Sequence, residues 1–76
     1  MNRKPVYLVM VTANNNNKFY RMIPDGDYFN VEYGRVGAAC QKARFAMSQW
    51  DKKYNEKTKK GYVDLPLNLT DQHNLF

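Results

Sequence analysis

Apolar and polar residues alternate over the first half of the chain in a pattern that predicts an antiparallel sheet. Residues 5–13 are apolar at nearly every position, so both faces are largely apolar, which is typical of a central strand. Residues 18–23 and 28–33 follow as strands, separated by Pro-Asp-Gly-Asp, which favours a tight turn. A fourth strand is predicted within residues 38–45, so these strands form a meander.

The period of the pattern then changes from two residues to three and four, which predicts one helix over residues 48–60. Trp50 and Tyr54 lie on its apolar face, and we expect both to be buried against the sheet. Ser48 and Asp51 have the spacing of a capping box at the start of the helix. A glycine after two lysines is a stop signal at its end.

Beyond the helix, an edge strand is predicted near residues 62–65, and residues 66–76 have no period. The sequence therefore predicts an α+β fold, an antiparallel sheet of four or five strands with one α-helix packed on it. Residues 1–65 are expected to form the domain. Residues 66–76 are expected to be a C-terminal tail or the start of a linker.

The charge of the chain points to an anionic partner. Twelve Lys and Arg oppose seven Asp and Glu among 76 residues, a net charge of +5. Nucleic acid, an acidic protein surface and simple solubility are all compatible with this balance. The single cysteine and the lack of a signal peptide or membrane-spanning run favour an intracellular, cytoplasmic protein that does not contact a membrane.

Enzyme chemistry is not expected from these residues. The only histidine, His73, lies in the segment without a pattern, where a solvated side chain is the simplest interpretation. Cys40 is expected within the fourth strand as a buried, inert thiol without a histidine near it in sequence. No spacing of cysteine, histidine or carboxylate residues suggests a metal site, and no cofactor is predicted.

Cations and aromatic residues are interleaved along the chain, as in Lys-Phe-Tyr-Arg and Tyr-Gly-Arg. Cations neutralise phosphates and aromatic rings stack on sugars or bases, so the pattern is compatible with nucleic-acid binding. Core aromatics with cations outside them would give the same pattern. The predicted nucleic-acid-binding residues are Tyr33, Gly34, Arg35, Lys42, Arg44 and Lys18.

The turn after the third strand allows two interpretations. Tyr33 and Arg35 are displayed on either side of Gly34 for a partner, or Tyr33 is buried under the helix and Arg35 pairs with Glu32 or a carbonyl group. Lys57, on the helix, is expected to lie far from this turn.

Two segments, Glu-Tyr-Gly-Arg-Val-Gly and Lys-Lys-Tyr-Asn-Glu-Lys-Thr-Lys-Lys-Gly-Tyr, give the chain its resemblance to a known family. Together they resemble the WGR domain over about residues 5–65, with Tyr33 in place of the signature tryptophan. The resemblance implies an antiparallel sheet with one helix and a role in DNA binding. In poly(ADP-ribose) polymerases this domain binds near DNA breaks, with the signature aromatic on a strand-end sugar and the arginine towards neighbouring domains.

Carried over to this chain, those roles fall on Tyr33 and Arg35. The first hypothesis is therefore a non-catalytic module that binds DNA ends or strand junctions without strong sequence preference. The alternative is a protein-interaction or regulatory module that docks on an acidic partner or on a neighbouring catalytic domain.

Overall fold

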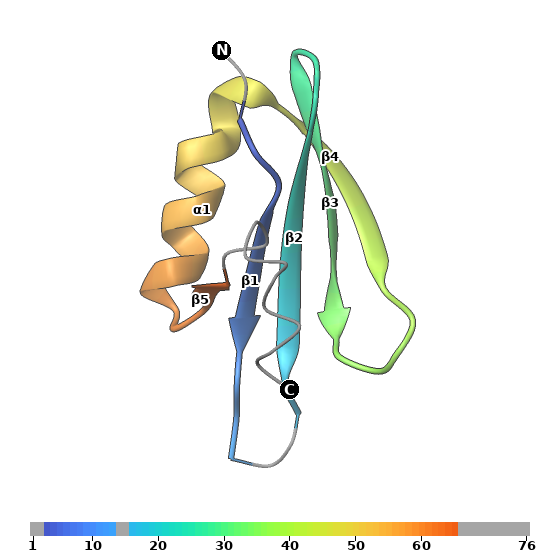
Figure 1. Ribbon diagram of the computed structural model, residues 1–76, viewed down its shortest axis with the longest axis vertical. Coiled ribbons are helices and arrows are strands. Elements are labelled where there is room, and N and C mark those ends of the chain that lie inside the picture. Colours follow the sequence, from blue (N-terminus) through green and yellow to red (C-terminus); the bar gives the residue numbers. More distant parts are fainter. Residues whose placement is uncertain (1–2, 14–15, 66–76) are drawn as a thin grey trace, which may run out of the picture.

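Five strands and one α-helix make up the part of the chain that the structure, a computed structural model, describes, namely residues 3–13 and 16–65. The strands are β1 (Val6–Met10), β2 (Lys18–Asp25), β3 (Tyr28–Arg35), β4 (Gln41–Ala46) and β5 (Val63–Leu65). A 3₁₀ turn, η1 (Met47–Gln49), leads into α1 (Trp50–Lys59). The predicted α+β class, an antiparallel sheet with one helix packed on it, is confirmed (Figure 1).

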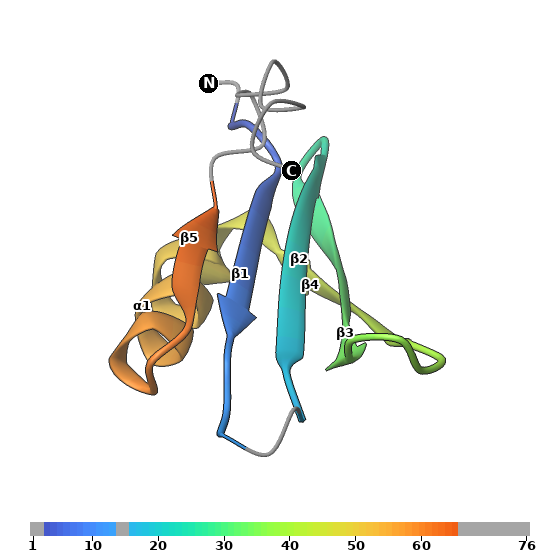
Figure 2. The ribbon, with the colours of Figure 1, turned by 60° about the horizontal axis from the view of Figure 1, so that its bottom comes forward.

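The strands are arranged in the order β4-β3-β2-β1-β5, and every neighbouring pair is antiparallel. Gly26 has a φ of +64° in the two-residue turn between β2 and β3, a conformation that favours glycine. Figure 2 shows β5 beside β1, although these strands are the last and the first in the chain. The first strand is therefore flanked on both sides, as predicted for a central strand, and β5 is the predicted edge strand.

The core lies between α1 and one face of the sheet. Leu8, Met22, Phe29 and Val31 are completely buried there, one or two from each of the three central strands. Trp50, in the first turn of α1, is 5% exposed and meets the ring of Phe29 edge-on at 5.0 Å between centroids. The predicted burial of Trp50 is confirmed, and aromatic contact adds to the area that this ring buries.

The start of the helical segment differs from the prediction. The backbone N–H of Met47 donates to the carbonyl of Asp27 at 2.8 Å, and the 3₁₀ turn begins at this residue. Ser48 therefore lies inside the first turn instead of before it. Neither η1 nor α1 has a side-chain cap, so the predicted capping box of Ser48 and Asp51 is wrong.

Tyr54 joins α1 to the edge of the sheet. Its ring packs against the core and is half-buried, and its hydroxyl donates a hydrogen bond to the Asp64 carboxylate on β5 at 2.9 Å. The same hydrogen bond raises the pKa of the Tyr54 hydroxyl, since it favours the protonated form. The full burial that was predicted for Tyr54 is therefore wrong.

Successive side chains of each strand point to opposite faces of the sheet. We call the face that carries α1 the helix face and the other the open face. Phe29, Val31 and Tyr33 share the helix face, as the alternation of β3 predicted. In residues 3–13 and 16–65, α1 is the only helix of more than three residues, and it packs on the helix face alone.

Candidate nucleic-acid interface

The six residues predicted to bind nucleic acid lie on both faces of the sheet. Tyr33, Arg35 and Lys18 occupy helix-face positions. Tyr33 and Arg35 are two residues apart on β3 and so share a face, and Lys18 is the register partner of Arg35. Lys42 and Arg44 occupy open-face positions of β4. The structure brings together the first three residues and separates them from Lys42 and Arg44, while the sixth residue, Gly34, has no side chain to place on either face.

Tyr33 is neither fully displayed nor fully buried. Its ring is half-buried beside the core, with its centroid 6.1 Å from that of Tyr20. Its hydroxyl donates a hydrogen bond to Gln41 Oε1 at 3.3 Å. The side chain is thus held in a defined orientation while part of the ring stays accessible.

Gly34 adopts a φ of +151°, a backbone conformation that residues with a side chain rarely adopt. A Cβ atom there would meet the Ala39 carbonyl oxygen and Cys40 Cα at 3.5 Å, which is ordinary contact, so the backbone angle is the main reason for glycine. The turn extends to Cys40, since β4 begins at Gln41. Cys40 is exposed, so its predicted place as a buried thiol within a strand is wrong.

Arg35 and Lys18 are two cations directly opposite each other at the end of β2 and β3. Like charges directly opposite each other destabilise a sheet. Arg35 is exposed, and its Nη1 donates to Asn16 Oδ1 at 3.3 Å. Glu32 instead forms an ion pair with Arg21 at 3.0 Å, so the alternative in which Arg35 pairs with Glu32 is not what the structure contains.

Next to this pair of cations, a hollow of about 240 Å³ lies between α1 and strands β2, β3 and β4. We call it the basic hollow. The ammonium of Lys57 lies 4.6 Å from the centre of the Tyr20 ring, and that of Lys53 lies 4.5 Å from the Phe45 ring. Its lining includes Tyr20, Tyr33, Phe45, Lys53, Glu56 and Lys57.

The pKa of Lys57 reports the charges around the basic hollow. Partial burial lowers the pKa of its ammonium, and repulsion from Lys60, Lys53 and Lys18 lowers it further, while Glu56 acts in the opposite direction. Several lysines therefore contribute to one positive field at this end of the helix face. Such a field attracts an anion.

Lys57 does not lie far from Tyr33, contrary to the prediction, because both side chains line the basic hollow. Lys53 also forms an ion pair with Glu56, at 4.0 Å. A signal in the sequence was available: Lys53 and Lys57 follow Trp50 by three and seven residues. This spacing places them on the side of the helix that faces the sheet.

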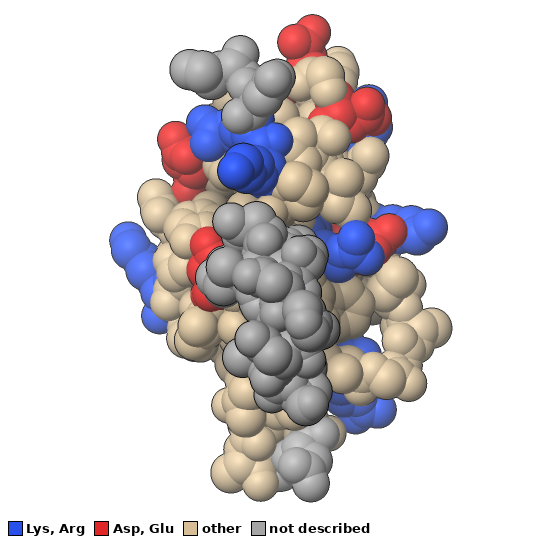
Figure 3. All heavy atoms as spheres, in the orientation of Figure 1, with Lys and Arg blue, Asp and Glu red and all other residues tan. Residues whose placement is uncertain are grey.

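On the open face, the charges of β4 have acidic neighbours. Arg44 donates to Asp25 Oδ2 at 2.8 Å and covers the Tyr28 ring at 4.7 Å. The hydrogen bond and the charge of Arg44 lower the pKa of Asp25. Lys42 is the register partner of Glu32. Figure 3 likewise shows basic and acidic side chains interspersed among the coloured atoms of one view of the molecule.

Tyr20 provides a pH test of the packing beneath the basic hollow. Burial, and secondarily Glu56, raises the pKa of its hydroxyl to about 12, against about 10 for an unfolded tyrosine. Between these values the unfolded chain has lost a proton that the folded protein keeps, so stability falls as pH rises from about 10 to 12. In Tyr20→Phe, the urea midpoint should fall less between pH 8 and 11 than in wild type. Equal falls of the urea midpoint in the two proteins would contradict the raised pKa of Tyr20.

Groups of three or more potential metal ligands are absent from the described residues, as are helices long and apolar enough to cross a membrane. His73, Asn14 and Asn15 lie outside the residues that the structure describes.

The sequence profile of the WGR domain matches residues 4–68, most of the chain. Protein 101L of Invertebrate iridescent virus 6 is 49% identical over 59 residues, which are 76% of this chain and 25% of that protein. The chain therefore spans about a quarter of the length of this curated relative. No solved structure matches the chain.

Proposed function

The chain belongs to the WGR domain family, a family of non-catalytic domains, and we propose that it binds nucleic acid. The ligand that we propose is a DNA end or strand junction, bound without strong sequence preference. The binding surface is the helix face around Tyr33, namely the cation pair of Lys18 and Arg35 with the adjoining basic hollow. The open-face residues Lys42 and Arg44 are not part of it.

The observation that carries this proposal is the placement of Lys18 directly opposite Arg35, beside Tyr33. Two facing cations disfavour the free protein, and a phosphate between them would remove the repulsion. Lys53 and Lys57 extend the positive charge along the basic hollow. A phosphate backbone that follows this surface would meet cations at each of these points.

The aromatic residues of the basic hollow offer rings on which a sugar or base can stack. Tyr33 is held by its hydrogen bond to Gln41 and remains partly accessible. A partly accessible ring near the end of β3 suits the terminal sugar or base of a DNA end, where no neighbouring nucleotide occupies the stacking position. Rings and phosphates are common to all sequences, which accounts for the proposed lack of sequence preference.

The proposal predicts a linear fall of log affinity with log salt concentration. With roughly three to five phosphate contacts, the slope for a short duplex should be about −0.9 per contact. Lys18→Ala and Arg35→Ala should each make the slope shallower by about 1, because each removes one phosphate contact. Fluorescence anisotropy with a labelled duplex measures the slope.

Lys42→Ala is the matched control for this titration. It removes the same charge from the open face and should leave the slope within error of wild type. If Lys42→Ala reduces the slope as much as Lys18→Ala, the assignment to the helix face is wrong. A folded protein that does not bind DNA even at low salt would contradict nucleic-acid binding itself.

A second candidate function is docking on a protein partner through the same turn. Val36 follows Arg35 directly and is 51% exposed, so the turn offers an apolar side chain beside a cation. An acidic surface or a neighbouring catalytic domain would fit this combination. Val36→Ser should weaken such docking and leave the affinity for DNA unchanged.

A further inference from the structure

The open face of the sheet is more apolar than a face in contact with water normally is. Val9 of β1 is the register partner of Phe19 on one side and of Val63 on the other, which makes an apolar row across three strands. Tyr7 and Leu65 are partners in the next row. An antiparallel sheet with one solvated face usually presents polar side chains on it. Here β1 has the composition of a strand covered on both faces.

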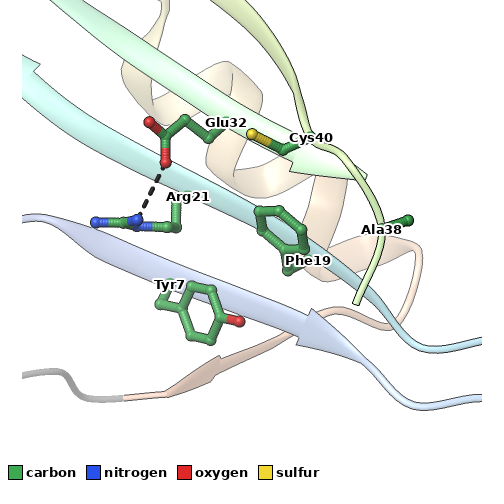
Figure 4. Close-up of a pocket in the computed structure, with 6 residues that line it drawn as sticks. All are labelled: Tyr7, Phe19, Arg21, Glu32, Ala38 and Cys40. Carbon is green, nitrogen blue, oxygen red and sulfur yellow. Dashed lines mark hydrogen bonds and ion pairs between the residues drawn. The ribbon is translucent and has the colours of Figure 1, made fainter. Parts of the chain in front are cut away.

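This face is also hollowed. A depression of about 500 Å³ has Tyr7, Phe19, Arg21, Glu32 and Cys40 in its lining. The two rings are 6.0 Å apart, and the ion pair between arginine and glutamate borders them. Figure 4 shows these side chains in front of the sheet with the helix behind it.

Two exposed side chains extend the apolar surface to the edge of the sheet. Val63 is 60% exposed and Leu65 is 42% exposed, although both belong to a strand. Neither contributes to the core under α1, because residue 64 between them occupies the helix-face position. Exposed apolar side chains next to a depression lined by two aromatic rings are typical of a surface to which another segment binds.

We propose that residues 66–76 of this chain cover the open face and place apolar side chains in the depression. These eleven residues follow Leu65 directly, and Leu65 already lies on the open face beside Tyr7. Extended, they would span about 36 Å. Crossing from β5 to β3 requires three strand spacings, about 15 Å. The segment is therefore long enough to reach every residue that lines the depression.

The sequence of this segment suits the surface. Leu67 and Leu69 are two residues apart and fall on one side of an extended chain. Pro66 has no amide hydrogen to donate to the ladder with β1, which favours a departure from the strand after Leu65. The segment contains no Lys or Arg, and the carboxylate of Asp71 is complementary to a protein of net positive charge.

The test is NMR on the full chain together with thermal unfolding. We expect nuclear Overhauser contacts between the methyl groups of Leu67 or Leu69 and the rings of Tyr7 or Phe19. The double variant Leu67→Ser, Leu69→Ser should lose these contacts and lower the Tm by about 4–8 °C or more. Since these substitutions change only the open face, the affinity of the double variant for DNA should equal that of wild type.

The matched control is Asn68→Ser, Thr70→Ser, which changes the alternate positions and removes little apolar area. Its contacts and Tm should stay close to those of wild type. Contacts that disappear on dilution would show a second copy as the cover and overturn the proposal. So would the absence of these contacts from the wild-type spectrum, or equal Tm values for the two double variants.

Discussion

Replacing Trp50 by alanine will lower the free energy of unfolding by about 3–5 kcal/mol, the largest effect we expect from one substitution. The ring is 5% exposed, lies edge-on to Phe29 and is also covered by the Arg3 guanidinium at 5.3 Å. Its removal leaves a cavity at the point where α1 begins. Such a loss is a large fraction of the stability of a domain this small.

Urea denaturation followed by circular dichroism measures the change, because the variant lacks the tryptophan needed for fluorescence. Trp50→Phe is the control, since it retains an aromatic ring against Phe29 and should lose much less stability. Arg3→Ala removes the covering cation alone and should cost less still. A Trp50→Ala midpoint close to that of wild type would mean that Trp50 does not support the core.

Tyr33→Ala should weaken binding to DNA ends roughly tenfold to a hundredfold, because stacking on an aromatic ring is worth about 1–3 kcal/mol per base. Tyr33→Phe keeps the ring and loses only the hydroxyl that donates to Gln41. It should therefore bind within a few-fold of wild type. Binding to linear duplexes with free ends is compared with binding to closed circles of the same sequence.

Because the Tyr33 ring also packs beside Tyr20, the fold of Tyr33→Ala must be verified by its thermal melt. A folded variant that distinguishes ends from circles as wild type does would contradict the role of Tyr33 at DNA ends. An unfolded variant would assign the ring to the core instead. The comparison with Tyr33→Phe then shows whether the loss follows the ring or the hydroxyl.

The strands of the sheet were predictable because the sequence signals that define them lie within a few neighbouring residues. A period of two residues assigns Phe29, Val31 and Tyr33 to one face without knowledge of the partner strands. The turn at Gly26 then fixes the pairing of β2 with β3. The start of the helix depended instead on a hydrogen bond from Met47 to the distant Asp27, which no local signal reports.

The candidate site was less predictable because it is assembled across elements. Lys42 and Arg44 are two residues apart and share a face of β4, but their relation to Tyr33 depends on the β3–β4 register. The approach of Lys57 to Tyr20 depends on where α1 crosses the sheet. Cys40 was misplaced because the turn after Gly34 takes up more residues than the apolar pattern indicates.

The pairing of β1 with β5 has a consequence for longer polypeptides. Tyr7 near the start of β1 lies opposite Leu65 at the end of β5, so the chain enters and leaves the sheet at the same corner. Sequence added before β1 or after β5 need not cross the sheet or break a strand pair. Chain ends that lie close together in this way are why domain insertion is tolerated. The same fold can thus be inserted as a unit into a longer polypeptide. In protein 101L, the matching segment is a quarter of a longer protein.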